Sequence, residues 1–202
     1  MRKLWGPLGW MTLHSISALY PNEPSQDDKK TLKEFLDLFA ETITCFQCKS
    51  HFGTIINIHK SSNPDFLDSR QKFALFVFRA HNTVNLRLDK PRPSSMSECL
   101  RTLKLATAQT SFASFRISYL SYLLRNWQRE GSGQAMILMG QVKEMIEINN
   151  HYWSPRETSI PELEEGDVTT PITLNNARLN SRGVPVSTRI GFIGGRLKLA
   201  KR

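Results

Sequence analysis

Two cysteines separated by two residues, Cys45 and Cys48, are the side chains best suited to chemistry in this sequence. Two thiols at this spacing can form a small disulfide, exchange it with another dithiol, or supply half of a metal site. Helically spaced residues follow the pair, namely Cys48, Phe52, Ile55, Ile56 and His59. The spacing predicts that both cysteines lie at or near a helix N-terminus, where free backbone N–H groups and the helix dipole lower the pKa of a thiol.

A zinc site and two ordinary buried thiols are the alternatives to redox use of this pair. Zinc takes about four ligands in structural sites. Beyond the pair, the chain offers Cys99, five histidines and carboxylates, with no second CxxC. This supply of ligands makes zinc the weaker interpretation. Redox use is therefore the favoured interpretation of Cys45 and Cys48.

The composition is that of a globular chain with a basic end. The 202 residues are 40% hydrophobic, and the longest apolar runs are too short to cross a membrane. The first residues carry no apolar stretch typical of a signal peptide, and three cysteines are too few for a disulfide scaffold, so we expect a reducing compartment. The net charge is +9, but seven Lys and Arg and no acid lie between Asn176 and Arg202, so the remainder is nearly neutral.

Apolar periodicity predicts an all-α fold with a four-helix bundle and a short fifth helix. We expect Pro7 in the first turn of the first helix and Asp27 and Asp28 as the cap and first-turn acids of the second. The β-branched run at 42–44 predicts a break just before Cys45. The first helix is predicted to cover Pro7–Leu19. The helices after the second are predicted to cover Cys45–Lys60, Ser69–Leu88 and Ser95–Lys104. Short loops between them favour an antiparallel bundle over residues 1–104.

The rest of the chain divides into a helical part and an irregular part. In residues 105–153, two amphipathic segments flank the turn Gly131-Ser132-Gly133 and predict a helical hairpin that packs on the bundle or on a partner. Residues 154–202 are rich in Pro, Gly, Asn and Ser and predict an irregular or disordered tail, acidic and then basic. We expect the basic end to be a solvated charge run; contact with nucleic acid or a virion surface is the alternative.

Three separated motifs have ordinary interpretations when each is considered alone. They are Trp5-Gly6-Pro7-Leu8-Gly9-Trp10 with His14, then Cys45-Phe46-Gln47-Cys48 with His51-Phe52, then His81-Asn82-Thr83-Val84-Asn85 followed by Leu88 and Lys90-Pro91. Trp10 would be a core residue, His14 a satisfied core histidine, and His81 with Asn85 a polar patch on a helix. Their order along about residues 4–99 adds information that no single motif carries.

In this order, the three motifs resemble the Erv/ALR family of FAD-dependent sulfhydryl oxidases. The resemblance implies a helical bundle that holds FAD at one end, with the CxxC pair, Cys45 and Cys48, as catalytic residues beside the flavin. It implies cofactor contacts from Gly6, Trp10, His14, Cys48, His81, Asn82, Val84, Asn85, Leu88 and Lys90. Their chemistry suits this role, because a flavin needs flat apolar walls and its pyrophosphate needs a cation, for which Lys90 and Arg87 are available. No Gly-rich dinucleotide fingerprint is present, so a Rossmann site is not expected.

The resemblance also implies a reaction and a partner. A substrate thiolate would attack Cys45, and Cys48 would pass two electrons to the flavin, from which molecular oxygen takes them as hydrogen peroxide. The chain lacks the second, shuttle CxxC of many members, so we expect it to meet a thioredoxin-like or other dithiol protein directly. Phe78 occupies the position of a cysteine found in many members, which leaves Cys99 without that partner.

Short members without a shuttle are typical of large cytoplasmic DNA viruses. The resemblance therefore implies a homodimer that acts in the host cytoplasm at viral assembly sites, or in the virion. Two other functions stay open at this point. One is a flavin-free dithiol oxidoreductase, although no strand pattern precedes Cys45. The other is a non-enzymatic helical interaction protein whose CxxC is structural or binds zinc.

Overall fold

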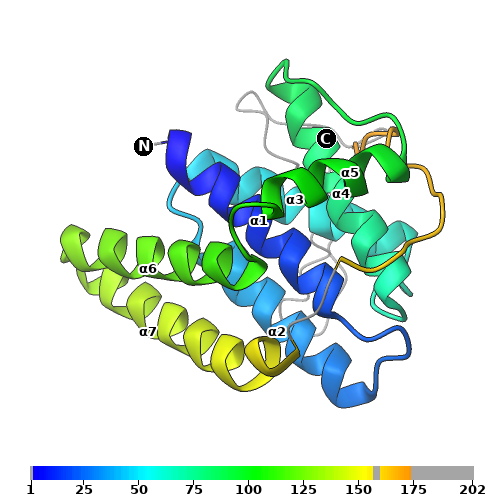
Figure 1. The fold of residues 1–202 in the computed structure, drawn as a ribbon. Coiled ribbons are helices and arrows are strands. Elements are labelled where there is room, and N and C mark those ends of the chain that lie inside the picture. The colour runs from blue at the N-terminus through cyan, green and yellow to red at the C-terminus, as the bar shows by residue number, and fades with distance from the viewer. Residues whose placement is uncertain (1, 157–159, 174–202) are drawn as a thin grey trace, which may run out of the picture.

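The computed structural model describes residues 2–156 and 160–173, and every regular element in these ranges is helical (Figure 1). The elements are α1 (Arg2–Leu19), α2 (Gln26–Thr42), α3 (Phe46–Ser62), α4 (Arg70–Arg87), α5 (Met96–Thr107), α6 (Phe112–Glu130), α7 (Gly133–Ile148), the π-helical turn η1 (Asn149–Trp153) and the 3₁₀ turn η2 (Ser154–Arg156). The all-α prediction is confirmed. Within the described ranges, no helix is long and apolar enough to cross a membrane.

Serine begins most of these helices. Ser25 caps α2 and forms a capping box with Asp28, in which each side chain satisfies a backbone N–H of the other residue. Four other helices also have a serine as the N-cap residue, namely Ser69, Ser95, Ser111 and Ser132. Their hydroxyls accept a hydrogen bond from the third helical N–H, which would otherwise lack a partner. At α3 the same position is held by Cys45.

The structure corrects three predicted helix ends. α1 begins at Arg2, so Pro7 lies inside this helix rather than in its first turn. The fixed φ of proline suits the helix, but beyond the first turn its missing N–H leaves one helical hydrogen bond unformed and its ring crowds the carbonyl four residues earlier. The cap of α2 is Ser25, and Asp27 and Asp28 both belong to the first turn. α5 continues to Thr107, three residues beyond the predicted boundary at residue 104.

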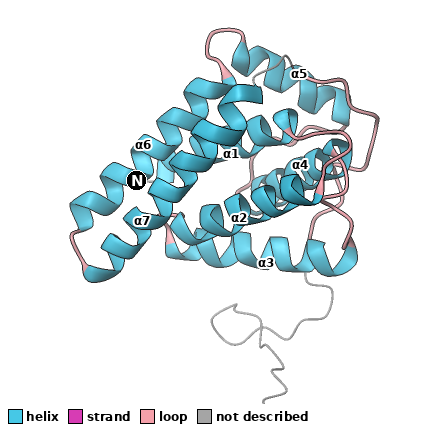
Figure 2. Ribbon diagram, turned by 90° about the horizontal axis from the view of Figure 1, so that it is seen from below, coloured by secondary structure: helices cyan, strands magenta, loops and turns pink. Residues whose placement is uncertain are grey.

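α1 is the central helix of the fold. It packs against α4 on one side and α6 on another, while α2 packs against α3 and α7 (Figures 1 and 2). The main core contains fully buried aromatic side chains from several helices, among them Tyr20, Phe35, Phe73, Phe76 and Tyr119. The predicted hairpin of α6 and α7 is therefore part of the same core as the bundle.

The hairpin is joined to the bundle by polar contacts as well as apolar ones. Gly131, with φ 67°, ends α6 in the left-handed conformation that glycine adopts without a steric cost. The fully buried Arg116 of α6 donates to Ser15 Oγ of α1 at 2.5 Å and to Asn149 Oδ1 of η1 at 2.8 Å. Buried charged groups need such partners. The bond to Ser15 joins the hairpin to α1, and the bond to Asn149 joins α6 to η1.

Residues 160–173 have no regular structure, yet they pack on α4 and α5. Gln71 of α4 both donates to and accepts from the backbone of Glu164, at 2.8 and 3.0 Å. The Glu165 carboxylate accepts from the first backbone N–H groups of α5, and Val168 and Ile172 are buried. An irregular segment was predicted, but its packing was not. The basic tail from Asn176 to Arg202 and Glu157 of the acidic patch lie outside the described residues.

Candidate active site

Cys45 and Cys48 form a disulfide at the N-terminus of α3, with their Cα atoms 5.2 Å apart. Cys45 is the N-cap residue, and its Sγ accepts a hydrogen bond from Cys48 N at 3.4 Å. The predicted position at a helix start is confirmed. A thiolate there is stabilised by the free backbone N–H groups and the positive end of the helix dipole. This turn therefore favours release of a thiolate when the disulfide opens.

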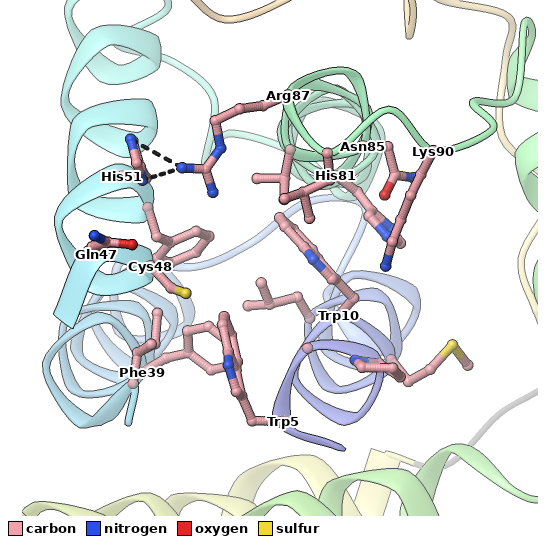
Figure 3. A pocket seen from close by; sticks show the side chains of 18 of the residues that line it. Trp5, Trp10, Phe39, Gln47, Cys48, His51, His81, Asn85, Arg87 and Lys90 are labelled. Atoms are coloured by element: carbon pink, nitrogen blue, oxygen red, sulfur yellow. Dashed lines mark hydrogen bonds between the residues drawn. The ribbon is translucent and has the colours of Figure 1, made fainter. Parts of the chain in front are cut away.

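A cavity of about 570 Å³ adjoins this disulfide on the side of Cys48 (Figure 3). Its lining includes eight of the predicted site residues, namely Gly6, Trp10, Cys48, His81, Val84, Asn85, Leu88 and Lys90. The sulfur of Cys48 points into this space (Figure 3). Cys45 is not part of the lining. The two sulfurs therefore have different surroundings, one beside the cavity and one on its outer side.

Aromatic side chains form the walls of the cavity. Trp10 of α1 stacks on His81 of α4, with ring centroids 4.4 Å apart and planes 7° from parallel. Trp10 also meets Phe52 edge to face at 6.0 Å. Trp5 and Phe39 line the cavity near Cys48 (Figure 3). Flat apolar walls of this kind suit a planar ring system.

Behind the Trp10 stack, His14 and His81 form a hydrogen-bonded pair. His14 Nε2 lies 3.0 Å from His81 Nδ1, and His14 is almost fully buried. Burial, followed by the charge of Lys90, lowers the pKa of His81 to about 4. Burial, followed by the neighbouring His81, lowers the pKa of His14 well below its usual range. Both rings are neutral at pH 7, so one donates the shared hydrogen bond and the other accepts it.

Basic and amide side chains gather on the α4 side of the cavity. Arg87 Nη1 lies 3.0 Å from Nε2 of His51 on α3, and burial together with the Arg87 charge lowers the pKa of His51. Lys90 follows α4, and the Asn85 amide donates to the Pro91 carbonyl at 3.4 Å. Arg87, Lys90 and Asn85 all line the cavity. This edge suits an anionic group such as a phosphate.

Two predicted cofactor residues do not line the cavity. His14 lies behind His81 and reaches the site only through that ring. Asn82 is buried, and its amide donates to the carbonyls of Pro93 and Val168, at 3.1 and 2.8 Å. In this structure the Asn82 amide thus holds the loop after α4 and the C-terminal segment. Its long-range partner Val168 explains why local spacing alone did not predict this role.

Sequence reasoning did not assign several other lining residues to the site, among them Trp5, Phe39, Gln47 and His51. His51 and Trp5 belong to two of the three sequence motifs, but a role in the site was predicted only for other residues of those motifs. Trp5 comes one residue before the predicted Gly6, and the true start of α1 at Arg2 makes it helical. Phe39 lies on the buried face of α2, and this face contributes both to the core and to the cavity wall.

The chain belongs to the Erv1 / Alr family. Residues 8–104 match the family's sequence profile. The chain is 35% identical over 92 residues to the putative FAD-linked sulfhydryl oxidase 347L of Invertebrate iridescent virus 6, a match that covers 44% of this chain and 82% of that protein. The helical fold and the site described above carry the motifs on which the sequence resemblance rested.

Two other relatives show how much of the chain the likeness covers. FAD-linked sulfhydryl oxidase ERV1 of Arabidopsis thaliana is 34% identical over 85 residues, 42% of each chain. The putative FAD-linked sulfhydryl oxidase 096R of Invertebrate iridescent virus 3 is 33% identical over 90 residues, 45% of this chain and 60% of that protein. The chain thus spans about half the length of these two relatives. No solved structure matches the chain.

Proposed function

We propose that the protein is an FAD-dependent thiol oxidase that makes disulfides in a dithiol protein and passes the electrons to molecular oxygen. The observation that carries this proposal is the asymmetric placement of the disulfide. Both cysteines are partly buried, but Cys48 lines an aromatic cavity, whereas Cys45 lies outside its lining. One sulfur is thus suited to contact a cofactor and the other to contact a substrate. The names of the relatives, all FAD-linked sulfhydryl oxidases, agree with this use.

The cavity fits FAD in size and in chemistry. Its volume of about 570 Å³ lies within the range of roughly 300–1,000 Å³ that is usual for cofactor sites. Trp10, Phe39 and Val84 offer apolar surface for a flavin ring, and Cys48 faces the same space. Arg87 and Lys90 offer positive charge for the pyrophosphate. Bound there, the flavin supplies the transfer of two electrons to oxygen, which yields hydrogen peroxide.

The chain's own contribution is thiol–disulfide exchange. A substrate thiolate attacks Cys45 Sγ and forms a mixed disulfide, while the Cys45–Cys48 bond breaks and the electron pair leaves on Cys48. The Cys48 thiolate lies in the first turn of α3, where the helix dipole favours it. A second substrate thiol then attacks the mixed disulfide, which releases an oxidised substrate and leaves Cys45 and Cys48 reduced. Two electrons thereby reach the sulfur that faces the cavity.

Phe46 supports a protein rather than a small molecule as the thiol substrate. This ring lies between the two cysteines in sequence and is 84% exposed. An exposed large aromatic next to Cys45 provides apolar area that an approaching protein surface can bury. We infer that the substrate is a thioredoxin-like or other protein with apolar residues around its reactive cysteine.

The remaining expectations concern the protein's context. Viral relatives support action in the host cytoplasm at assembly sites or in the virion, which immunolocalisation in infected cells would test. Homodimerisation, expected from the family resemblance, is tested by light scattering. Nucleic-acid contact by the basic tail, the alternative to a solvated charge run, predicts salt-sensitive DNA binding that is lost when the chain is truncated after Asn175.

Absorbance and oxygen uptake test the proposed activity. The purified protein should carry a flavin absorbance, lose it anaerobically with dithiothreitol, and consume oxygen with the same dithiol. Cys48→Ser should keep the flavin absorbance and lose turnover, because no thiolate then faces the cavity. Cys99→Ser is the matched control, since Cys99 is buried in a second core cluster and burial raises its pKa to about 12. A colourless protein that stays inert to oxygen after addition of FAD would contradict the proposal.

A further inference from the structure

The segment that joins α2 to α3 carries the disulfide, and two side chains of α6 contact this segment and the end of α2. This linker comprises only Ile43, Thr44 and Cys45. Ile43 ends α2 in an extended conformation, is buried and lines the cavity. α6 lies beyond residues 8–104, the part that matches the family profile. The contacts that follow therefore belong to the part of the chain outside the family match.

The first contact fixes the end of α2. The last carbonyls of a helix have no partner within it. The indole Nε1 of Trp127 on α6 donates to the Thr42 carbonyl at 3.2 Å, in a buried position. The Thr42 hydroxyl donates to the Leu38 carbonyl at 2.8 Å and lies 3.5 Å from the sulfur of Met145 on α7. Both hairpin helices thus contact the last residue of α2.

The second contact falls one residue before the disulfide. The hydroxyl of Tyr122 on α6 lies 3.2 Å from Thr44 Oγ1, and either group can donate. Tyr122 therefore contacts the linker itself and Trp127 contacts the residue just before it, so the two contacts lie on either side of Ile43. With the end of α2 and Thr44 both fixed, the backbone of Cys45 has little freedom to move away from Cys48.

A third contact reaches the cavity wall. Tyr119 of α6 is fully buried, and its ring centroid lies 5.2 Å from that of Phe39, a lining residue. A Cβ at Gly9 of α1 would meet both of these rings at 3.4 Å, so the glycine lets α1 approach them closely. The wall on this side is thus two side chains deep, with Phe39 in front and Tyr119 behind.

We propose that α6 is a positioning element for the redox disulfide, with Tyr122 and Trp127 as positioning residues that hold the α2–α3 linker in the conformation in which Cys45 and Cys48 are bonded. That this disulfide reacts during turnover rests on the proposed function. The contacts that hold the linker do not depend on that function. The inference assigns a role to residues 112–130, which the family likeness leaves unassigned. It also means that a chain cut after residue 104 would lack part of its own site.

Two variants of the full chain test this role with little loss of volume. Tyr122→Phe removes only the hydroxyl next to Thr44, and Trp127→Phe removes the indole N–H that bonds the Thr42 carbonyl. The control is Trp153→Phe, because Trp153 is buried in the same extension and packs on Phe35, while its indole N–H has no hydrogen-bond partner within the described residues. All three variants lose aromatic packing or polar groups of the extension, but only two of them touch the linker.

The first measurement is amide hydrogen exchange of peptides that cover residues 43–48, which requires neither turnover nor oxygen. We expect exchange there to be faster by roughly threefold to tenfold in Tyr122→Phe and Trp127→Phe, the range that one lost hydrogen bond allows. The second is the equilibrium of the Cys45–Cys48 disulfide with anaerobic glutathione buffers, trapped by alkylation and read by mass spectrometry. The same variants should shift it towards the dithiol by a similar factor.

The control should leave both measurements at wild-type values even if its free energy of unfolding falls. Wild-type exchange and wild-type disulfide equilibrium in both linker variants would overturn the proposal. Equal changes in Trp153→Phe would overturn it too, because they would mean a general loss of stability. A colourless protein that still shows the expected exchange pattern would refute the proposed oxidase and leave this positioning role intact.

Discussion

Acidification should destabilise the fold through the His14–His81 pair, and the size of the effect follows from the structure. The pKa of His81 is about 4 in the folded protein, against an ordinary value of 6.5. Because the folded pKa is lower than the unfolded one, the stabilisation is fully present above pH 6.5 and is lost as pH falls towards 4. Between pH 7 and pH 5, His81 alone should cost about 2 kcal/mol of unfolding free energy. His14, whose pKa is lowered in the same direction, adds to this loss.

His81→Phe separates this contribution from the rest of the molecule. The phenyl ring keeps the stack on Trp10 but cannot share the hydrogen bond with His14. The variant should therefore be less stable at pH 7 by about 1–3 kcal/mol, the usual cost of a buried group left without its partner. Its further loss between pH 7 and pH 5 should be smaller than that of the wild type by about 2 kcal/mol. His59, with a pKa also lowered to about 4, contributes equally to both proteins.

Urea unfolding at pH 7 and pH 5, at one saturating FAD concentration, measures these differences. His151→Gln is the control, because His151 is exposed and its partner Glu147 is exposed as well. NMR of the histidine ring protons gives a direct reading, and the His81 signals should stay in their neutral position down to about pH 5. If His81 instead titrates with a midpoint above pH 6, or if His81→Phe loses as much stability as the wild type on acidification, the reasoning fails.

Further predictions concern the cavity and its mouth. Lys90→Gln should weaken FAD binding by about tenfold, with a smaller salt dependence, in a fluorescence titration, because one phosphate partner is lost; unchanged affinity would remove Lys90 from the site. Trp10→Ala should also release FAD and lower the melting temperature, whereas Trp10→Phe should retain most of both. Turnover can be compared between a dithiol peptide with flanking Trp residues and one with flanking Ser residues. Phe46→Ser should lower the ratio of the first rate to the second by about tenfold, and Phe46→Leu should preserve this ratio.

The helices around the disulfide could be predicted because their signals are local. The β-branched run at 42–44 predicted a break, and α2 does end at Thr42. Ser69 and Leu88 were predicted as the ends of the fourth helix, and they are its N-cap and C-cap. The predicted start of α1 was wrong because Pro7 was interpreted as a first-turn residue, the position where proline is tolerated best, whereas α1 begins at Arg2.

The parts that could not be predicted depend on contacts between distant residues. Asn82 has the chemistry of a cofactor ligand, but its amide is taken up by Val168, 86 positions later. Trp127 lies on the apolar face of an amphipathic segment and Tyr122 does not, and nothing in the spacing of either residue indicates a polar partner next to the disulfide. Apolar periodicity predicts that a face is buried, but not which residues it is buried against.

The position of Cys45 shows how the fold and the proposed chemistry depend on the same turn. In five other helices a serine hydroxyl satisfies the third N–H of the helix, and at α3 a cysteine sulfur does so. Sulfur is a weak acceptor when neutral and a stronger one as a thiolate. This helix start is therefore capped best when the disulfide is open and Cys45 carries a negative charge. The linker contacts from α6 favour the bonded geometry, so the cap and the hairpin act in opposite directions on the same disulfide.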